Sequence, residues 1–287
     1  MKINVFLGAV AAMLLLLSPS VSARSEAGRK ISPSKSVITD RRTSAMNFTK
    51  IEVSRAVKLV VEDRTDDVIV VRANENVMPY VELSVKNGRL KASLSGDLNM
   101  SSISNNLVVE VSIPNNGRID DVRVSGASSV TIVPRVQGQS FYAEVSGASS
   151  LTADIAASRC SIEVSGASSA KFSYDGGQLS LDVSGASAAK GTVNALKSAI
   201  EVSGASAAHI DGKSESSVVE VSGASAFKGS NFETSVCTAE VSGVSAAEVC
   251  CSESLSADAS GMSKIVYSGE CRLSSVSTSG AGSIRKK

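Results

Sequence analysis

The stretch IEVSGASSAKF, at residues 162–172, decides how this chain folds. Apolar and polar side chains alternate on both sides of a Ser-Gly pair, as they do in a β-strand that is buried on one face. The next two copies, LDVSGASAAK at residues 181–190 and IEVSGASAAH at residues 200–209, repeat both the alternation and the turn. This recurrence indicates a repeat architecture in which each unit adds one layer.

Nine glycines mark the repeat, and each follows a serine. Their successive spacings are 21, 19, 19, 19, 19, 20, 18 and 19 residues. A glycine at each corner permits a backbone angle, or a close approach of two chains, that a Cβ atom would block. The predicted turn glycines are Gly126, Gly147, Gly166, Gly185, Gly204, Gly223, Gly243, Gly261 and Gly280.

The length of the unit selects the fold class. A helical-pair repeat needs about 33 residues or more, so a unit of this length accommodates only short strands and tight corners. Apolar side chains recur two and four residues before each glycine and four and six after it. The sequence therefore predicts an all-β protein, a right-handed parallel β-helix of about nine rungs that stack about 4.8 Å apart. We favour the right-handed form because the strict hexapeptide pattern of left-handed coils is absent.

The serines two residues after the turn glycines have two interpretations. If the alternation continues through the corner, they point inward and form a hydroxyl ladder; if the bend breaks the alternation, they face water. The serines concerned are Ser128, Ser149, Ser168, Ser187, Ser206 and Ser225.

Residues 1–23 have the pattern of a signal peptide. A lysine at position 2 precedes an uncharged apolar run over residues 5–17, and Val21-Ser22-Ala23 offers a small-x-small cleavage site. The run is shorter than the roughly 20 apolar residues of a membrane span, and no later segment is apolar enough to be one. We expect an exported protein that is located outside the cytoplasm.

The rest of the chain divides at changes of pattern. Residues 24–45 are polar and predict a solvated linker, and residues 46–284 form one β-helical domain. Within that domain, residues 46–113 predict strands of alternating pattern with a turn at Asn87-Gly88, and residues 114–284 predict the repeat rungs. Residues 285–287 form a basic tail.

The composition excludes several classes of function. A formal net charge of +1 gives no reason to expect a nucleic-acid partner. A single histidine, His209, excludes most metal triads and Ser-His-Asp schemes, and the absence of tryptophan argues against stacking platforms. We therefore expect no metal, no cofactor and no catalytic residues. Since His209 occupies a slot that neighbouring units fill with lysine, we expect a solvated surface histidine.

An acidic ladder is the best candidate for a binding site. The residue three before each of seven successive glycines is acidic and should face outward, where a row of like charges is unfavourable. Such a row can bind cations or a basic partner, or it can be a solvated face that a partial basic column offsets. That column, five residues after the glycines, contains Lys171, Lys190, His209 and Lys228. The predicted ladder is Glu144, Glu163, Asp182, Glu201, Glu220, Glu240 and Asp258.

The chain has five cysteines, an odd number for an exported protein. Cys160 and Cys237 share an offset but lie four rungs apart, which is about 19 Å at the rung spacing and too far for a disulfide. Cys251 and Cys271 fall in adjacent rungs, so they can pair, with Cys250 as a competitor. Unpaired thiols in a narrow core are the equal alternative.

The sequence resembles the head GIN domain family, whose members are labelled auto-transporter adhesins. The resemblance rests on FTKIEVSRAVKLVVE followed by ENVMPYVELSV, on the train of Val-Ser-Gly-Ala-Ser units, and on the terminal Ser-Gly-Ala-Gly-Ser-Ile at residues 279–284. It covers nearly all of the chain after the signal peptide. The resemblance implies a β-helical fold and export by a Gram-negative, often Bacteroidetes-type, cell, and it supplies no catalytic residues. With the signal-peptide pattern, it leads us to expect a location in the periplasm, at the cell surface or outside such a cell.

These observations favour a non-enzymatic envelope or surface protein that presents a repetitive β-ladder surface to an envelope or extracellular ligand, either protein or glycan. One alternative is an extracellular polysaccharide-active enzyme of the β-helix type, because some β-helical enzymes cut polysaccharides. A structural spacer is another. An enzyme should show one groove lined by unlike polar groups, whereas a binding module or spacer should show uniform ladders.

Overall fold

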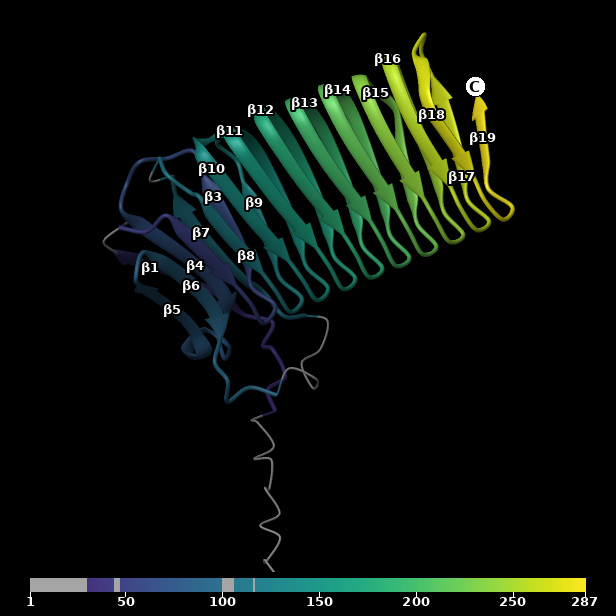
Figure 1. Ribbon diagram of the computed structural model, residues 1–287. Helices are drawn as coiled ribbons and strands as arrows, with labels where there is room; N and C mark the ends of the chain where they lie inside the picture. Colours follow the sequence, from purple (N-terminus) through teal and green to yellow (C-terminus); the bar gives the residue numbers. More distant parts are fainter. Residues whose placement is uncertain (1–29, 44–46, 100–105, 116) are drawn as a thin grey trace, which may run out of the picture.

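The computed structural model describes residues 30–43, 47–99, 106–115 and 117–287. In those ranges the chain forms β-strands and one turn of 3-10 helix, η1 (Met78–Tyr80). A broader N-terminal part leads into a long, regular solenoid (Figure 1). The predicted all-β, parallel β-helical class is confirmed. The predicted signal peptide, residues 1–23, lies outside the described residues.

The solenoid consists of parallel strands in register. Val164 pairs with Val183, and Val183 with Val202, so each rung lies directly over the one before. Most rungs are one strand of 14 to 16 residues that bends halfway and runs back along the other side. The full rungs are β11 (Ser150–Val164), β12 (Ser169–Val183), β13 (Ala188–Val202), β14 (Ala207–Val221), β15 (Ala226–Val241) and β16 (Ala246–Ala259), and the shorter β10 (Val136–Val145) precedes them. Shorter strands complete the two ends: β8 (Asp121–Val124), β9 (Ser129–Ile132), β17 (Lys264–Ser268), β18 (Arg272–Thr278) and β19 (Ser283–Lys286).

The predicted turn glycines line up along one edge of the solenoid, which we call the turn edge. Their φ angles lie between +67° and +78°, a region that side chains rarely tolerate. A Cβ atom on Gly185 would also lie 2.6 Å from the carbonyl oxygen of Gly166. That same oxygen accepts a hydrogen bond from the Ala186 N–H at 2.7 Å. Glycine is therefore required both by the turn and by the stacking of turns.

The serines that follow the turns point inward, which decides between the two interpretations. Ser168 and Ser187 are buried, and the backbone N–H of Ser168 donates to the Ser187 hydroxyl at 3.3 Å. The same bond recurs between successive serines from Ser128 to Ser245. The ladder is therefore a row of N–H to hydroxyl bonds, which satisfies backbone donors that the turn would otherwise leave unpaired.

The interior is narrow and filled by one column of side chains per inward position. Alanine and valine occupy most of the positions beside the turn edge, and larger side chains such as Tyr174 and Phe232 occupy the opposite half. The buried Tyr174 hydroxyl donates to the carbonyl oxygens of Ala157 and Gln178, at 3.0 and 2.9 Å. This pairing avoids the free-energy cost of a buried hydroxyl without a partner.

A rung without glycine precedes the nine predicted ones. β2 (Lys50–Val53) and β3 (Lys58–Glu62) pair in parallel with β8 and β9, and the turn between them contains Arg55 and Ala56 at φ +59° and +63°. The Arg55 guanidinium donates to the carbonyl oxygens of Ser95 and Leu98. A count of glycines misses this rung because an anchored arginine takes the place of the glycine.

The other N-terminal strands cover the first end of the solenoid. β4 (Val68–Asn74) pairs antiparallel with β7 (Val109–Pro114), which in turn pairs with β3. β5 (Val81–Lys86) and β6 (Arg89–Leu94) form a hairpin, and β6 continues the sheet beside β2. Asn87 and Gly88 make its turn at φ +51° and +70°, as predicted.

The predicted linker at residues 24–45 needs a correction in its second half. Residues 37–43 form β1 (Val37–Thr43), which pairs antiparallel with β4 along its whole length. Its side chains are half-buried or exposed, so the pattern reads as polar although the backbone completes the edge of a sheet. Pairing with β4 satisfies backbone groups that a solvated linker would leave to water.

Candidate functional site

The seven predicted carboxylates form one row on the outer surface. Each is the strand partner of the next, beginning with Glu144 and Glu163 and ending with Glu240 and Asp258. The row lies on the half of each rung that leads into the turn edge, and we call that side of the solenoid the acidic face. Parallel partners stand about 4.8 Å apart, so each carboxylate has a like charge on either side.

Among the described residues, the acidic ladder has cationic and hydrogen-bonding partners at its beginning alone. Arg123, the partner of Glu144 on the preceding rung, has its guanidinium 3.7 Å from a Glu144 oxygen and 5.7 Å from the centre of the Tyr142 ring. Asp121 in particular raises the pKa of Arg123. Burial, together with the charges of Glu163 and Glu144, raises the pKa of Tyr142 to about 12. From Asp182 to Asp258 the carboxylates have no ion pair with any residue that the structure describes.

A basic ladder runs along the other half of the rungs. Lys171, Lys190, His209 and Lys228 are partners on successive strands, and Glu248 follows them. His209 lies at the surface, as predicted, with Nε2 3.5 Å from an Asp211 oxygen. We call this side of the solenoid the basic face.

Shallow troughs run along both sides of the basic ladder. One, of about 390 Å³, has a floor of small side chains that includes Ala170, Ala189 and Ala208. The other, of about 370 Å³, passes Phe172 and Gly191. The basic ladder is therefore a ridge between two hollows.

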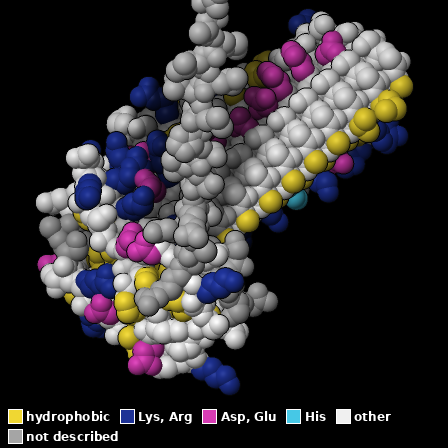
Figure 2. All heavy atoms as spheres, turned by 90° about the horizontal axis from the view of Figure 1, so that it is seen from below, with side chains coloured by type: hydrophobic (Ala, Val, Ile, Leu, Met, Phe, Trp, Pro, Cys, Tyr) yellow, Lys and Arg dark blue, Asp and Glu magenta, His cyan; other side chains and the backbone are white. Residues whose placement is uncertain are grey.

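The two ladders lie on opposite sides of the turn edge. Figure 2 looks onto this edge and shows acidic side chains along one side of the solenoid, and lysines with the single histidine along the other. No ion pair joins the two ladders within the described ranges. The basic column therefore does not offset the acidic one through direct contacts inside one molecule.

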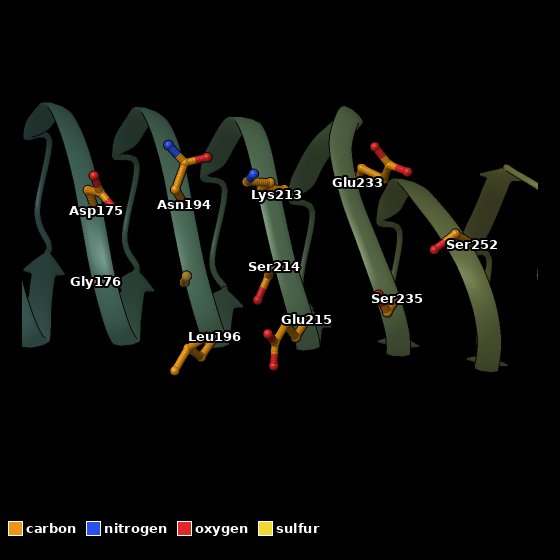
Figure 3. Close-up of a pocket in the computed structure, with 11 residues that line it drawn as sticks. Asp175, Gly176, Asn194, Leu196, Lys213, Ser214, Glu215, Glu233, Ser235 and Ser252 are labelled. Atoms are coloured by element: carbon orange, nitrogen blue, oxygen red, sulfur yellow. The ribbon is translucent and has the colours of Figure 1, made fainter.

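A groove lined by unlike polar groups lies at the opposite edge, where the rungs bend. It measures about 460 Å³, and Asp175, Asn194, Lys213 and Glu233 project into it from successive strands (Figure 3). Asp175 is also 3.2 Å from Arg135. We call this hollow the bend groove. The sequence analysis missed it because these positions do not repeat.

The shape of the bend groove follows from an irregularity in the repeat. The pairing register shifts between β14 and β15 and again between β15 and β16, where the glycine spacings are 20 and 18 residues. Bulges of this kind redirect side chains beside functional sites. Ser214, in the lining, is buried and donates to the carbonyl oxygen of Ser216 at 2.9 Å. The change of spacing was the one sequence signal for this site.

A fourth hollow, of about 570 Å³, lies on the acidic face away from the carboxylates. Apolar side chains such as Phe141, Leu179 and Val218 line most of it. Arg159 and Lys197 contribute cationic groups to its lining. We call this hollow the apolar groove.

All five cysteines lie in described parts of the chain and are free thiols, so the predicted disulfide between Cys251 and Cys271 is not formed in this structure. The two side chains are hydrogen-bonded neighbours in adjacent rungs, and burial, with Cys251, raises the pKa of Cys271. The Cys251 thiol donates to the Ser254 carbonyl oxygen at 3.1 Å. Burial raises the pKa of Cys160 and of Cys237 to about 12, which keeps both thiols protonated and inert.

The described ranges of the chain contain no cluster of three or more histidine, cysteine or acidic side chains arranged to hold a metal ion. They also contain no helix with the length and hydrophobicity needed to cross a membrane.

The fold and surface define a β-solenoid that displays repeated rows of charge. The chain belongs to the family described as "Putative auto-transporter adhesin, head GIN domain", whose model matches residues 47–191 and 167–271. This confirms the resemblance seen in the sequence. No curated protein matches the chain.

Solved structures with the same fold come from Parabacteroides. A protein of Parabacteroides distasonis titled a putative adhesin is 15% identical, with a TM-score of 0.62, over 90% of this chain and 100% of its own. A Parabacteroides merdae protein with the same title is 15% identical, with a TM-score of 0.61, over 90% and 99% of the two chains. Another Parabacteroides distasonis protein, titled a putative lipid binding protein, is 16% identical, with a TM-score of 0.62, over 90% and 100%. At these identities the likeness shows the fold alone.

Proposed function

We propose that this protein is an exported, non-enzymatic adhesin-type module that binds an envelope or extracellular ligand, protein or glycan, through the repeated surface of its solenoid. The observation that carries the proposal is the row of five carboxylates from Asp182 to Asp258, exposed or half-exposed and without an ion pair among the described residues. A chain that keeps such a row uncompensated leaves its charge available to a partner.

Membership of an adhesin family supports the binding role. The signal-peptide pattern of residues 1–23 supports export. The proposed location is the periplasm, the cell surface or the outside of a Gram-negative cell, as the family resemblance implies. A partner that spans several rungs would make many weak contacts at once, which raises the overall affinity well above that of one contact.

The test is a binding screen of the exported protein against envelope fractions and glycan arrays, with and without calcium. We expect capture of a ligand that weakens when D182N, E201Q and E220Q are combined. The matched control is S161A, S180A and S256A, which replaces one exposed and two half-buried serines of the neighbouring row and leaves the charge unchanged. Ligand binding that is unchanged in the variant with the three carboxylate substitutions would contradict a role for the acidic ladder.

A polysaccharide-active enzyme is the second candidate, and the bend groove is the observation that favours it. The groove contains three carboxylates, Asp175, Glu215 and Glu233, among unlike polar groups. Glycoside cleavage uses two carboxyl groups in distinct environments, one of them kept protonated by burial. Here all three are exposed, which supports binding over cleavage. Turnover of any polysaccharide in the screen, lost in E215Q or E233Q, would reverse this ranking.

A further inference from the structure

The basic ladder and the acidic ladder have the same spacing because they are rows on the same rungs. Lys171, Lys190 and Lys228 belong to rungs that also carry acidic-ladder residues such as Asp182 and Glu201. Successive side chains in either row are therefore about 4.8 Å apart, and the three lysines with His209 span about 14 Å. Any two copies of the chain present rows of opposite charge that match step for step.

Most members of each ladder have no ion pair with any residue that the structure describes. The three lysines have no ion pair with any described residue, and the acidic ladder has none from Asp182 onward. Each row therefore brings like charges together at strand spacing, an arrangement that is unfavourable in isolation. A contact between the acidic row of one copy and the basic row of another would reduce the repulsion between like charges in both rows.

The placement of the ladders permits that contact without any rotation. One lies three residues before each turn glycine and the other five after it, so they occupy opposite faces beside the same edge (Figure 2). A second copy that is shifted sideways, with its rungs parallel, sets its acidic face against the basic face of the first. The acidic row then meets the basic ridge and the troughs on either side of it.

We propose that the basic face is a docking surface for the acidic face of a second copy of this chain, so that solenoids associate side by side. Six full rungs with about eight residues on each side give a face of about 25 Å by about 29 Å, or roughly 700 Å² per partner, near the size of a specific interface. Because the acidic and basic faces differ, each added copy uses one of its faces and leaves the other unoccupied. Association therefore continues beyond a dimer.

Sedimentation velocity of the purified protein, from micromolar to millimolar concentration, tests this proposal. At about 20 mM salt we expect the mean mass to rise more than twofold with concentration, and at about 1 M salt we expect a monomer, since charges are then screened within about 3 Å. Reversing three cations in K171E/K190E/K228E should lower the association constant roughly a hundredfold. Thermal unfolding followed by circular dichroism verifies that each variant is folded.

A mixture of two charge-reversed variants tests directly whether the two ladders contact each other. The variant K171E/K190E/K228E is acidic on both faces, and D182K/E201K/E220K is basic on both, so each alone should stay monomeric. An equimolar mixture restores opposite charges across every contact and should associate as the unaltered protein does. The control K86E/K213E/R272E changes the net charge as much as the first variant but outside both ladders, and it should associate normally.

Three results would overturn the proposal. One is a protein that stays monomeric at low salt, and another is association that survives both charge reversals. The third is a monomer that binds heparin through Lys171, Lys190 and Lys228, which would assign the basic face to an anionic polysaccharide. A binding screen that captures no ligand would contradict the proposed function but would not change the sedimentation results. The two proposals can therefore be refuted independently.

Discussion

The N-terminal part and the solenoid use their charged residues in opposite ways. In the N-terminal part, charges pair with one another: Glu110 with Arg72 at 2.8 Å and Lys58 at 3.3 Å, and Arg64 with Glu62 at 2.6 Å. In the solenoid, charges stand in rows beside like charges, and most are unpaired among the described residues. Each part has a well-packed core, so the difference lies at the surface.

The difference shows what the repeat does for the molecule. A rung that copies its neighbour pairs its whole backbone and stacks identical side chains, so the solenoid does not depend on ion pairs for cohesion. The irregular N-terminal strands lack this register and use specific ion pairs and side-chain contacts, such as those of Arg55, to fix their positions. Regularity therefore leaves the solenoid charges free to act outside the molecule.

The largest expected effect is the loss of unfolding free energy in Gly185→Ala. Comparison with Gly88→Ala separates the cost of disturbing the stacked turns from the cost of backbone strain. Both residues have a positive φ, but a Cβ atom on Gly185 meets stacked backbone at 2.6 Å, whereas one on Gly88 meets nothing within 4 Å. We expect Gly88→Ala to lower the free energy of unfolding by about 1 kcal/mol and Gly185→Ala by about 3 kcal/mol or more. Chemical denaturation measures both, and equal losses would contradict stacked turns.

Ser187→Ala should have the next largest effect, because it leaves the buried Ser168 N–H without its acceptor. An unsatisfied buried donor costs about 1–3 kcal/mol. Ser169→Ala is the control, because Ser169 is exposed and lies on the rung of Ser168. It should change the unfolding free energy by less than about 0.5 kcal/mol. If the two variants are equally stable, the inward serine ladder has no stabilising role.

Acid should weaken the N-terminal part before the solenoid. Hydrogen bonds to Glu110, chiefly from Arg72, lower its pKa below the ordinary 4.5, and Ser112 and Arg64 do the same for Glu62. A lowered pKa gives stability that is present above the unfolded value and is lost as pH falls through the folded value. Hydrogen exchange from pH 6 to about pH 3 should show β3 and β7 opening first, by at most about 1 kcal/mol per exposed pair.

In Glu110→Gln, the Glu110 share of this pH dependence should disappear, while the exchange of β12 and β13 should be unaffected. Acid-induced opening that begins in the solenoid would reverse the comparison between the two parts.

The regular half of the fold could be predicted from the sequence because each rung states the same pattern again. The alignment of Gly126 to Gly280 on one edge and the outward acidic row follow from period and alternation alone. The rung at Arg55 could not be predicted, since its positive φ depends on contacts with Ser95 and Leu98, far along the chain. The bend groove was missed for a similar reason: its shape comes from register shifts between rungs and not from any motif.

The smallest expected effect is a difference in alkylation rate between the buried thiols of the solenoid core and the half-exposed thiols toward its C-terminal end. Cys160 and Cys237, with pKa values of about 12, should resist alkylation in the folded protein, whereas the half-exposed Cys250 and Cys271 should react slowly. Mass spectrometry before and after unfolding counts the modified thiols. Rapid modification of Cys160 would show that the solenoid opens more readily than its packing implies.

In-register stacking of the rungs is the claim on which both ladders depend, and paired cysteines test it directly. Ser169 and Ala188 are exposed partners on adjacent strands, whereas Ser169 and Ala207 lie two rungs apart, at about 10 Å. Mild oxidation followed by peptide mapping should give a disulfide in S169C/A188C and none in S169C/A207C, because a disulfide needs Cα atoms within about 7 Å. A bond in the second pair, or in neither, would contradict the stacked solenoid.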